Sequence, residues 1–139
     1  MTVLEWLDQG AMMNEIIEAK LAEREQLLSL ATKVTANNDG MPHSSGVSDK
    51  VGNIAVKMAA LSAEIDALID KYVDYKQQVN KALQKLPANQ YGVLHRRYVL
   101  QMSWDEIAYD MSYSRMQIWR IHNSGLKGLK SIVKVGKKS

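Results

Sequence analysis

The sequence contains no cysteine, and this absence removes three kinds of chemistry at once. Disulfides, zinc sites built from thiolates and a cysteine nucleophile are all excluded, and a chain without cysteine fits a reducing cytoplasm. Histidine is also scarce, and His43, His95 and His122 lie far apart in the sequence. No two of them have the spacing that places two metal ligands on one turn of a helix, so we expect no metal site and no cofactor.

Long apolar runs are missing too. No stretch of about eighteen consecutive apolar residues occurs, so no segment is expected to span a membrane. The start, MTVLEWLDQGAMM, carries Glu5 and Asp8 and lacks the basic stretch and long apolar core of a signal peptide. We therefore expect a soluble, cytoplasmic protein.

Charge divides the chain into two unlike parts. Residues 1–86 contain nine Lys or Arg and twelve Asp or Glu, a balance of −3, whereas residues 87–139 contain nine and three, a balance of +6. A strongly basic segment favours a polyanionic partner, most often nucleic acid, and the acidic part must have another role. The length of 139 residues suffices for a small domain with an extended appendage.

The acidic part carries a heptad pattern. Between residues 47 and 86, apolar residues recur at alternating steps of four and three, and only Gly52 weakens the pattern. Such a stripe is typical of a coiled coil. The helix would be about 55 Å long at 1.5 Å per residue, too long to bury its stripe inside a compact domain of this size, so its partner must be another long helix. The stripe consists of Val47, Val51, Ile54, Met58, Leu61, Ile65, Leu68, Tyr72, Tyr75, Val79, Ala82 and Leu86.

The partner helix is predicted in the same chain, between about Val3 and Ala36, where no proline occurs. Its apolar face consists of Met13, Ile17, Leu21 and Leu28, widened by Ile16, Leu27, Ala31 and Val34. This face is less regular, since Arg24 stands where strict heptads require an apolar residue. Two long helices with a short connector form an antiparallel, coiled-coil-like hairpin, predicted at residues 1–86 with its connector at about residues 37–48. We expect the longer stripe to leave apolar surface that a second copy covers, which favours a dimer.

Within the connector, ANNDGMPHSSGVSDK, the stretch MPHSSGVSDK contains a histidine, three serines and an aspartate, the residue types of a hydrolytic triad. A triad also needs a rigid scaffold and an oxyanion hole, and a loop at the tip of a hairpin supplies neither. Gly40, Pro42 and Gly46 instead favour a chain reversal, and Ser48 or Asp49 can cap the second helix. We therefore expect a connector and no enzyme, and the alternative role of the loop is contact with a protein or DNA partner.

Residues 87–139 predict a small three-helix domain. After the break at LPANQ, the stretch YGVLHRRYVL forms a helix of about ten residues, and the capping boxes SWDE and SRMQ start two further helices. Two helices that start only eleven residues apart, at Ser103 and Ser114, indicate a helix-turn-helix. Ser112 stands in the turn, where positive φ favours glycine, and a serine there costs about 1 kcal/mol. The buried positions of the unit are predicted at Ile107, Ala108, Met111, Tyr113, Ile118 and Ile121.

The stretch LHRRYVLQMSWDEIAYDMSYSRMQIWRIHNSGLKGLK resembles the fourth conserved region of bacterial sigma factors and the regulators that share its helix-turn-helix. The resemblance rests on an Arg-Tyr pair, a capped EIA helix, a serine-started recognition helix and the closing GLKGL. The whole chain is similar to the ArpU-like late transcription regulators of phages and prophages. This resemblance implies a DNA-binding regulator in the cytoplasm of a bacterial host cell, with host RNA polymerase as a further partner. Gly125 and Gly128 depart from the family pattern and predict a less rigid helix after about Ser124.

The residues that the buried set leaves outside form the predicted DNA-binding edge. Arg115 and Arg120 can bond guanine, Gln117 can reach adenine or a phosphate, and Met116 can touch a thymine methyl group. Trp119 is consistent with a base contact and also with a partly buried core residue. The predicted contacts with double-stranded DNA are Ser114, Arg115, Met116, Gln117, Trp119, Arg120 and Asn123, followed by Lys127, Lys130 and Lys134 of the basic tail.

Two other functions fit the same pattern. Small terminase subunits of the DNA-packaging machinery also join a helix-turn-helix to an oligomerising helical part, and a coiled-coil adapter with a basic end would bind an acidic protein. The chain lacks the aromatic-rich region with which a full sigma factor melts promoter DNA, so an activator or an adapter to polymerase is expected. Arg96 and Arg97 can contact the DNA backbone, but we expect one of them to pair with Asp105 or Glu106.

Overall fold

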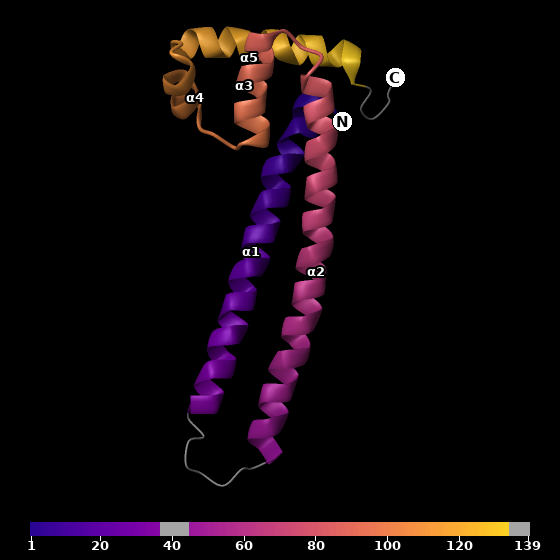
Figure 1. Ribbon diagram of the computed structural model, residues 1–139, viewed down its shortest axis with the longest axis vertical. Coiled ribbons are helices and arrows are strands. Elements are labelled where there is room, and N and C mark those ends of the chain that lie inside the picture. The colour runs from indigo at the N-terminus through magenta and orange to yellow at the C-terminus, as the bar shows by residue number, and fades with distance from the viewer. Residues whose placement is uncertain (37–44, 134–139) are drawn as a thin grey trace. The chain divides into compact units, whose positions relative to one another are not determined.

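All described elements are helical in the computed structural model, which describes residues 1–36 and 45–133 (Figure 1). The elements are α1 (Val3–Ala36), α2 (Ser45–Leu83), α3 (Ala88–Leu94), the π-helical turn η1 (His95–Val99), α4 (Trp104–Met111) and α5 (Arg115–Ile132). The predicted all-α fold class is confirmed, and the predicted bounds of the first helix agree with α1. Within the described ranges, no helix combines the length and the hydropathy that crossing a membrane requires.

The predicted connector lies partly outside the described residues. Its proline and its histidine belong to residues 37–44, and the described chain resumes at Ser45, where α2 begins. The predicted cap at Ser48 or Asp49 is therefore wrong, because both residues lie inside α2. The N–H groups of a first helical turn have no intrahelical partners in any case, so the poor helix formers Gly46 and Ser48 are tolerated there.

The chain forms two compact units whose boundaries cut across both long helices. The first unit comprises Met1–Met13 and the chain from Tyr72 onward, and the second comprises Asn14–Lys71. The boundary predicted from charge and from Pro87 falls between residues 86 and 87, just after the second long helix. The observed boundaries fall within the two long helices. The first unit extends beyond that boundary because the ends of both long helices supply part of its core.

The core of the first unit combines side chains from α1, α2, α3, η1 and α5. It consists of Val3, Leu7, Tyr75, Val79, Ala82, Leu83, Leu86, Leu94, Tyr98, Val99 and Leu129. The hydroxyl oxygen of Tyr75 lies 2.7 Å from the carbonyl oxygens of both Trp6 and Leu7, so this side chain ties α2 to α1. Burial raises the pKa of Tyr75 to about 12, and the group therefore remains a hydrogen-bond donor at any physiological pH.

In the second unit, α1 and α2 lie side by side and run in opposite directions (Figure 1). Lys20 Nζ lies 3.2 Å from Glu64 Oε2, and Arg24 donates from Nη1 to Ser62 Oγ at 3.3 Å. Residues that come later in α1 therefore lie beside residues that come earlier in α2, as in an antiparallel pair. The position of Arg24 in the apolar face is explained by this bond, since its guanidinium reaches a serine hydroxyl on α2.

The heptad stripe of α2 is confirmed at every position whose side chain is described. From Val51 to Leu86 each stripe residue is buried or partly buried within the single chain, so the expectation that this stripe leaves apolar surface for a second copy is wrong for the described residues. Helix α2 ends at Leu83, so the last stripe residue, Leu86, lies in the turn that follows. There its N–H donates to the Leu83 carbonyl oxygen. The large apolar side chains that remain exposed in the second unit lie off this stripe, and they are Ile16, Leu28, Leu30, Val56 and Ile69. Ile16 and Leu28 belong to the apolar face predicted for the first helix, so that prediction is wrong at these two positions.

Candidate nucleic-acid interface

Helices α4 and α5 both begin with a complete capping box, as the sequence predicts. At the start of α4 the Glu106 N–H donates to Ser103 Oγ at 3.1 Å, and the Ser103 N–H donates to Glu106 Oε1 at 2.8 Å. Ser114 and Gln117 form the same reciprocal pair at the start of α5, at 3.1 and 2.8 Å. Each box satisfies two N–H groups that a helix start leaves unpaired, and it therefore fixes where the helix begins.

The turn between α4 and α5 is short and contains one strained residue. Ser112 has φ 58° and ψ 40°, the left-handed conformation that the sequence predicts at this position. A residue with a Cβ atom adopts this conformation at a cost of about 1 kcal/mol. The N–H of Tyr113 donates to the Ala108 carbonyl oxygen at 3.0 Å, which closes the end of α4.

A small core holds α4 and α5 together. Ile107 and Ile118 are fully buried, and Val93 of α3 completes this cluster. The other four predicted core residues, Ala108, Met111, Tyr113 and Ile121, are partly buried against it, as are Met102 and Trp104. The predicted set is therefore confirmed. Val93 was missed because it lies outside the two helices from which the set was predicted.

The helix predicted at YGVLHRRYVL divides into α3 and the π-helical turn η1. Arg96 pairs with Asp110, with Nε 2.6 Å from Oδ2, so one arginine forms an ion pair as expected but with a different carboxylate. Asp105 and Glu106 are not the partners, because Glu106 closes the capping box and Asp105 faces Arg115. Arg97 donates to the Met102 carbonyl oxygen at 3.0 Å, and its guanidinium lies 4.4 Å from the ring centre of Trp104.

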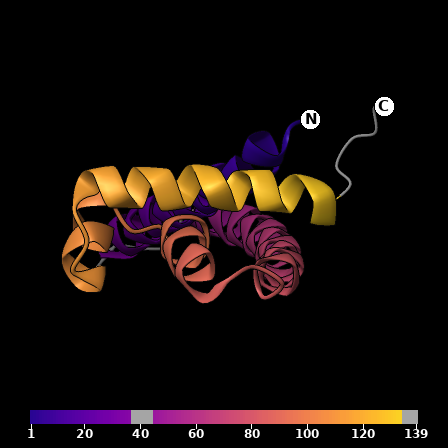
Figure 2. The ribbon, with the colours of Figure 1, turned by 90° about the horizontal axis from the view of Figure 1, so that it is seen from above.

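Helix α5 continues to Ile132, past the two glycines that predicted a weaker helix after Ser124. It lies across α3, with α4 near its N-terminal end (Figure 2). A Cβ atom at Gly125 would stand 2.7 Å from Leu94 Cδ1, and one at Gly128 would stand 2.9 Å from Leu86 Cδ2. The helix thus continues past both glycines, because they permit the close helix packing in which they take part.

The outer edge of α5 is exposed along its whole described length. Ser114, Arg115, Met116, Gln117, Trp119 and Arg120 are exposed, as the predicted buried set requires, and so are Lys127 and Lys130. Asn123 is partly buried, and Lys134 lies outside the described residues. The side chains of Met116 and Trp119 are 59% and 58% exposed, which is unusual for residues of this size and hydrophobicity. The exposure of these side chains agrees with the predicted edge, and their contact with DNA stays a prediction.

Several polar groups of this edge already have partners within the chain. Arg115 Nη1 lies 3.1 Å from Asp105 Oδ1 across the two helix starts, in a pair that is exposed to solvent and therefore weak. The amide oxygen of Gln117 accepts the Ser114 N–H, which leaves its NH₂ group as a donor. In this conformation Gln117 can donate to a phosphate but cannot form the bidentate bond to adenine, which requires the amide oxygen.

His122 is the main residue of the site that the sequence did not assign. It is only 4% exposed, and Tyr98 Oη lies 2.7 Å from its Nε2. Its ring stacks on Trp119 with centroids 6.1 Å apart and meets Trp104 edge-on at 5.0 Å. A signal was present in the sequence, because His122 follows the buried Ile118 by four residues, the spacing of one helix face.

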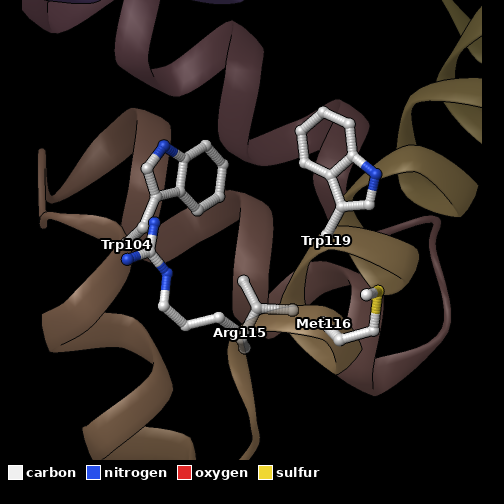
Figure 3. A pocket seen from close by; sticks show the side chains of 5 residues that line it. Trp104, Arg115, Met116 and Trp119 are labelled. Atoms are coloured by element: carbon white, nitrogen blue, oxygen red, sulfur yellow. The ribbon is translucent and has the colours of Figure 1, made fainter.

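A pocket of about 350 Å³ opens between the starts of α4 and α5. Its lining consists of Trp104, Arg115, Met116, Ile118 and Trp119. Figure 3 shows the two indoles on opposite sides of the pocket, with the Arg115 side chain extended toward Trp104 and Met116 on the side of Trp119. The lining is thus mostly apolar, and its one charged residue is a cation.

The family model described as "Protein of unknown function (DUF722)" matches residues 10–131. The chain belongs to the DUF722 family. No curated protein and no solved structure matches it. The match includes all of α4 and nearly all of α5, so the candidate interface of this DUF722 chain lies within the region by which the family is defined.

Proposed function

We propose that this DUF722 chain is a phage or prophage transcription regulator that binds double-stranded DNA through a helix-turn-helix formed by α4 and α5. In this proposal α5 enters the major groove, and α1 and α2 form one long antiparallel hairpin. The resemblance to ArpU-like regulators and to the fourth conserved region of sigma factors supports the assignment. The protein acts as an activator or as an adapter to host RNA polymerase and is not an enzyme.

The observation that carries the proposal is the charge of α5. This helix contains four basic residues, Arg115, Arg120, Lys127 and Lys130, and no acidic residue. All four are exposed. DNA presents closely spaced phosphates, and a helix that carries cations along its length without any carboxylate is attracted to them and meets no repulsion.

The first turns of α5 also suit the reading of bases. Residues near the start of a recognition helix contact base edges, and Met116, Trp119 and Arg120 are exposed there. The side chain of Arg120 has no ion pair or hydrogen bond with any described residue. A bidentate bond from Arg120 to guanine would therefore require no existing contact to break.

Self-association is the second part of the proposal. The exposed apolar side chains Leu28, Leu30 and Val56 of the second unit are 49%, 50% and 69% exposed. Contact with a second copy would cover such side chains, and a dimer would present two recognition helices to a repeated or palindromic site.

The DNA-binding proposal is tested with the full chain, because the core of the first unit includes Val3 and Leu7 and a fragment from residue 87 onward would lose them. We expect fluorescence anisotropy with labelled duplex DNA to give binding that weakens steeply with salt. If about five phosphates are contacted, the slope of log K against log salt is about −4 to −5.

Substitutions then separate base contacts from phosphate contacts in the same assay. Arg120→Ala should lower the preference for the selected site over random duplex by about 1–3 kcal/mol. Lys130→Ala should weaken both duplexes equally, and Lys57→Ala, in the second unit, should change neither. Binding that is insensitive to salt, or an equal loss on both duplexes from Arg120→Ala, would contradict the proposal.

A further inference from the structure

We propose that the pocket between α4 and α5 holds the 5-methyl groups of thymines at the edge of the major groove, and so makes this chain a reader of thymine. The inference rests on the proposed DNA binding and adds to it a specific base and a specific set of contacts. Its starting point is the apolar lining of the pocket, formed by Trp104, Met116, Ile118 and Trp119.

The two indole walls are held at different angles by one buried ring. The Trp119 ring is inclined by 22° to His122, whereas the Trp104 ring is inclined by 87° to it. His122 is in turn bonded to Tyr98, and Ile118 is 1% exposed, so these residues brace the pocket from the protein side. The pocket is therefore preformed, and a ligand does not have to order its aromatic walls.

Charge around the pocket favours DNA as its occupant. Arg97 covers one face of Trp104, Arg115 lines the pocket, and Arg120 follows Trp119 on the same helix. The nearby carboxylate of Asp105 is paired with Arg115. An apolar pocket surrounded by cations matches the edge of a DNA groove, where thymine methyl groups lie between rows of phosphates.

The polar side chains on the outer edge of α5 do not by themselves account for base recognition, so apolar contact with thymine methyl groups can contribute to it. Gln117 uses its amide oxygen in the capping box, so it cannot form the bidentate bond that reads adenine. Thymine carries the only methyl group that a base presents in the major groove, so an apolar pocket beside Arg120 can distinguish it from cytosine. A volume of about 350 Å³ admits more than one methyl group, so we expect one or two adjacent thymines to be read.

The experiment uses the full chain and a duplex selected from a random library by its binding. Each thymine of that site is replaced in turn by deoxyuridine, which removes only the methyl group. We expect binding to weaken about fourfold at one or two adjacent positions, the factor that burial of one methyl group gives, and to stay unchanged at the others.

Variants then assign the effect to the pocket. Trp119→Ala and Met116→Ala should each bring the ratio of thymine to deoxyuridine affinity at the sensitive position close to one. Tyr109→Ala is the matched control, because Tyr109 is 89% exposed on α4 and does not line the pocket, and this variant should keep the full ratio. Circular dichroism checks that each variant is folded. Met116→Ala carries the test if Trp119→Ala is unfolded, because Trp119 stacks on the buried His122 and Met116 belongs to neither core cluster.

The outcomes distinguish this inference from the proposal on which it rests. Salt-dependent DNA binding without sensitivity to deoxyuridine at any position overturns thymine reading and leaves the proposed function in place. A sensitivity that both pocket variants keep also overturns it, because the methyl groups then lie elsewhere. Absence of binding to any duplex overturns both.

Discussion

Three aromatic rings surround His122, and this one side chain positions the surface that we assign to DNA. Tyr98 bonds and stacks on it from η1, Trp104 contacts it from α4, and Trp119 covers it on the outer edge of α5. Nδ1 lies 3.3 Å from Asn123 Oδ1, so in the neutral ring Nδ1–H can donate to Asn123 while Nε2 accepts from the Tyr98 hydroxyl. Protonation of the ring removes the acceptor, so the bond that Tyr98 donates can persist only with its direction reversed.

Stability should therefore fall as the medium becomes acidic. Burial holds the pKa of His122 below its ordinary value of 6.5, and Arg97 acts in the same direction, while Asn123 and Asp8 partly oppose them. The unfolded chain takes up a proton near pH 6.5, but the folded chain resists protonation until the pH falls below the lowered pKa. The free energy of unfolding is highest above this window and decreases as the pH falls through it.

Urea unfolding at about pH 7.5 and about pH 5.5 measures this loss of stability. The variant His122→Gln should lose less stability between the two values than the unaltered chain. Some loss should remain, because burial and the nearby Arg96 and Lys76 also lower the pKa of His95. His95→Gln gives the comparison, and an unchanged pH dependence in His122→Gln would show that His122 is not the group involved.

Sequence and structure agree best at the residue scale where the cause is local. The capping boxes and the positive φ of Ser112 depend on neighbours within three or four residues, and both were predicted. The partner of Arg96 was not, because Asp110 approaches it only after η1 and α4 pack together. The pocket escaped prediction for the same reason, since Trp104 and Trp119 line it from two different helices.

At the scale of elements, the glycines of α5 reverse the usual expectation for glycine in a helix. Glycine normally weakens a helix interior by about 0.5–1 kcal/mol relative to alanine. Gly125 instead lets α5 approach α3, where Leu94 is fully buried and its side chain cannot move away freely. The bounds of a helix can be predicted from propensity and periodicity, but a close approach between two helices depends on tertiary packing that neither reveals.

Alanine substitutions at two helical glycines should therefore have opposite effects. Gly125→Ala should destabilise the chain by about 1–3 kcal/mol, because the new Cβ atom overlaps Leu94. Gly52→Ala, in α2, meets no atom within 4 Å and should stabilise the chain by about 0.5–1 kcal/mol. Denaturant unfolding of both variants measures the difference, and equal effects would mean that the close packing of α5 on α3 is incorrect.

For the whole molecule, the sequence predicted the long helices and their stripe but not the division into units. Charge and Pro87 separate the chain at one point in the sequence, whereas the core of the first unit recruits Leu7 and Val79 from the far side of that point. Whether residues of the long helices join this core depends on which ends of the helices pack together in the fold. Periodicity predicts which face of a helix is buried, but it does not predict which other elements that face contacts.

Self-association is the prediction at this scale. We expect sedimentation velocity at micromolar concentration to give a dimer, and Leu30→Asp or Val56→Asp to convert it to a monomer of 15.6 kDa. These positions are suitable because both side chains are exposed, whereas Leu61 is 8% exposed and an aspartate there would disrupt the second unit itself.

Arg120→Ala serves as the control for self-association and should remain a dimer, since its side chain lies on α5 in the first unit. A monomer for the unaltered chain would refute the pairing and leave the second unit as a spacer or as an arm that docks another protein.

The shared core of the first unit also sets an order for folding during synthesis. Val3 and Leu7 are made well before their core partners Leu94 and Leu129, and Leu129 comes only near the end of the described chain. Contacts between residues so distant in sequence form late and slowly. Until α5 has been made, the first turns of α1 lack part of their core packing, so a partly synthesised chain has not yet assembled the surface for which we propose DNA binding.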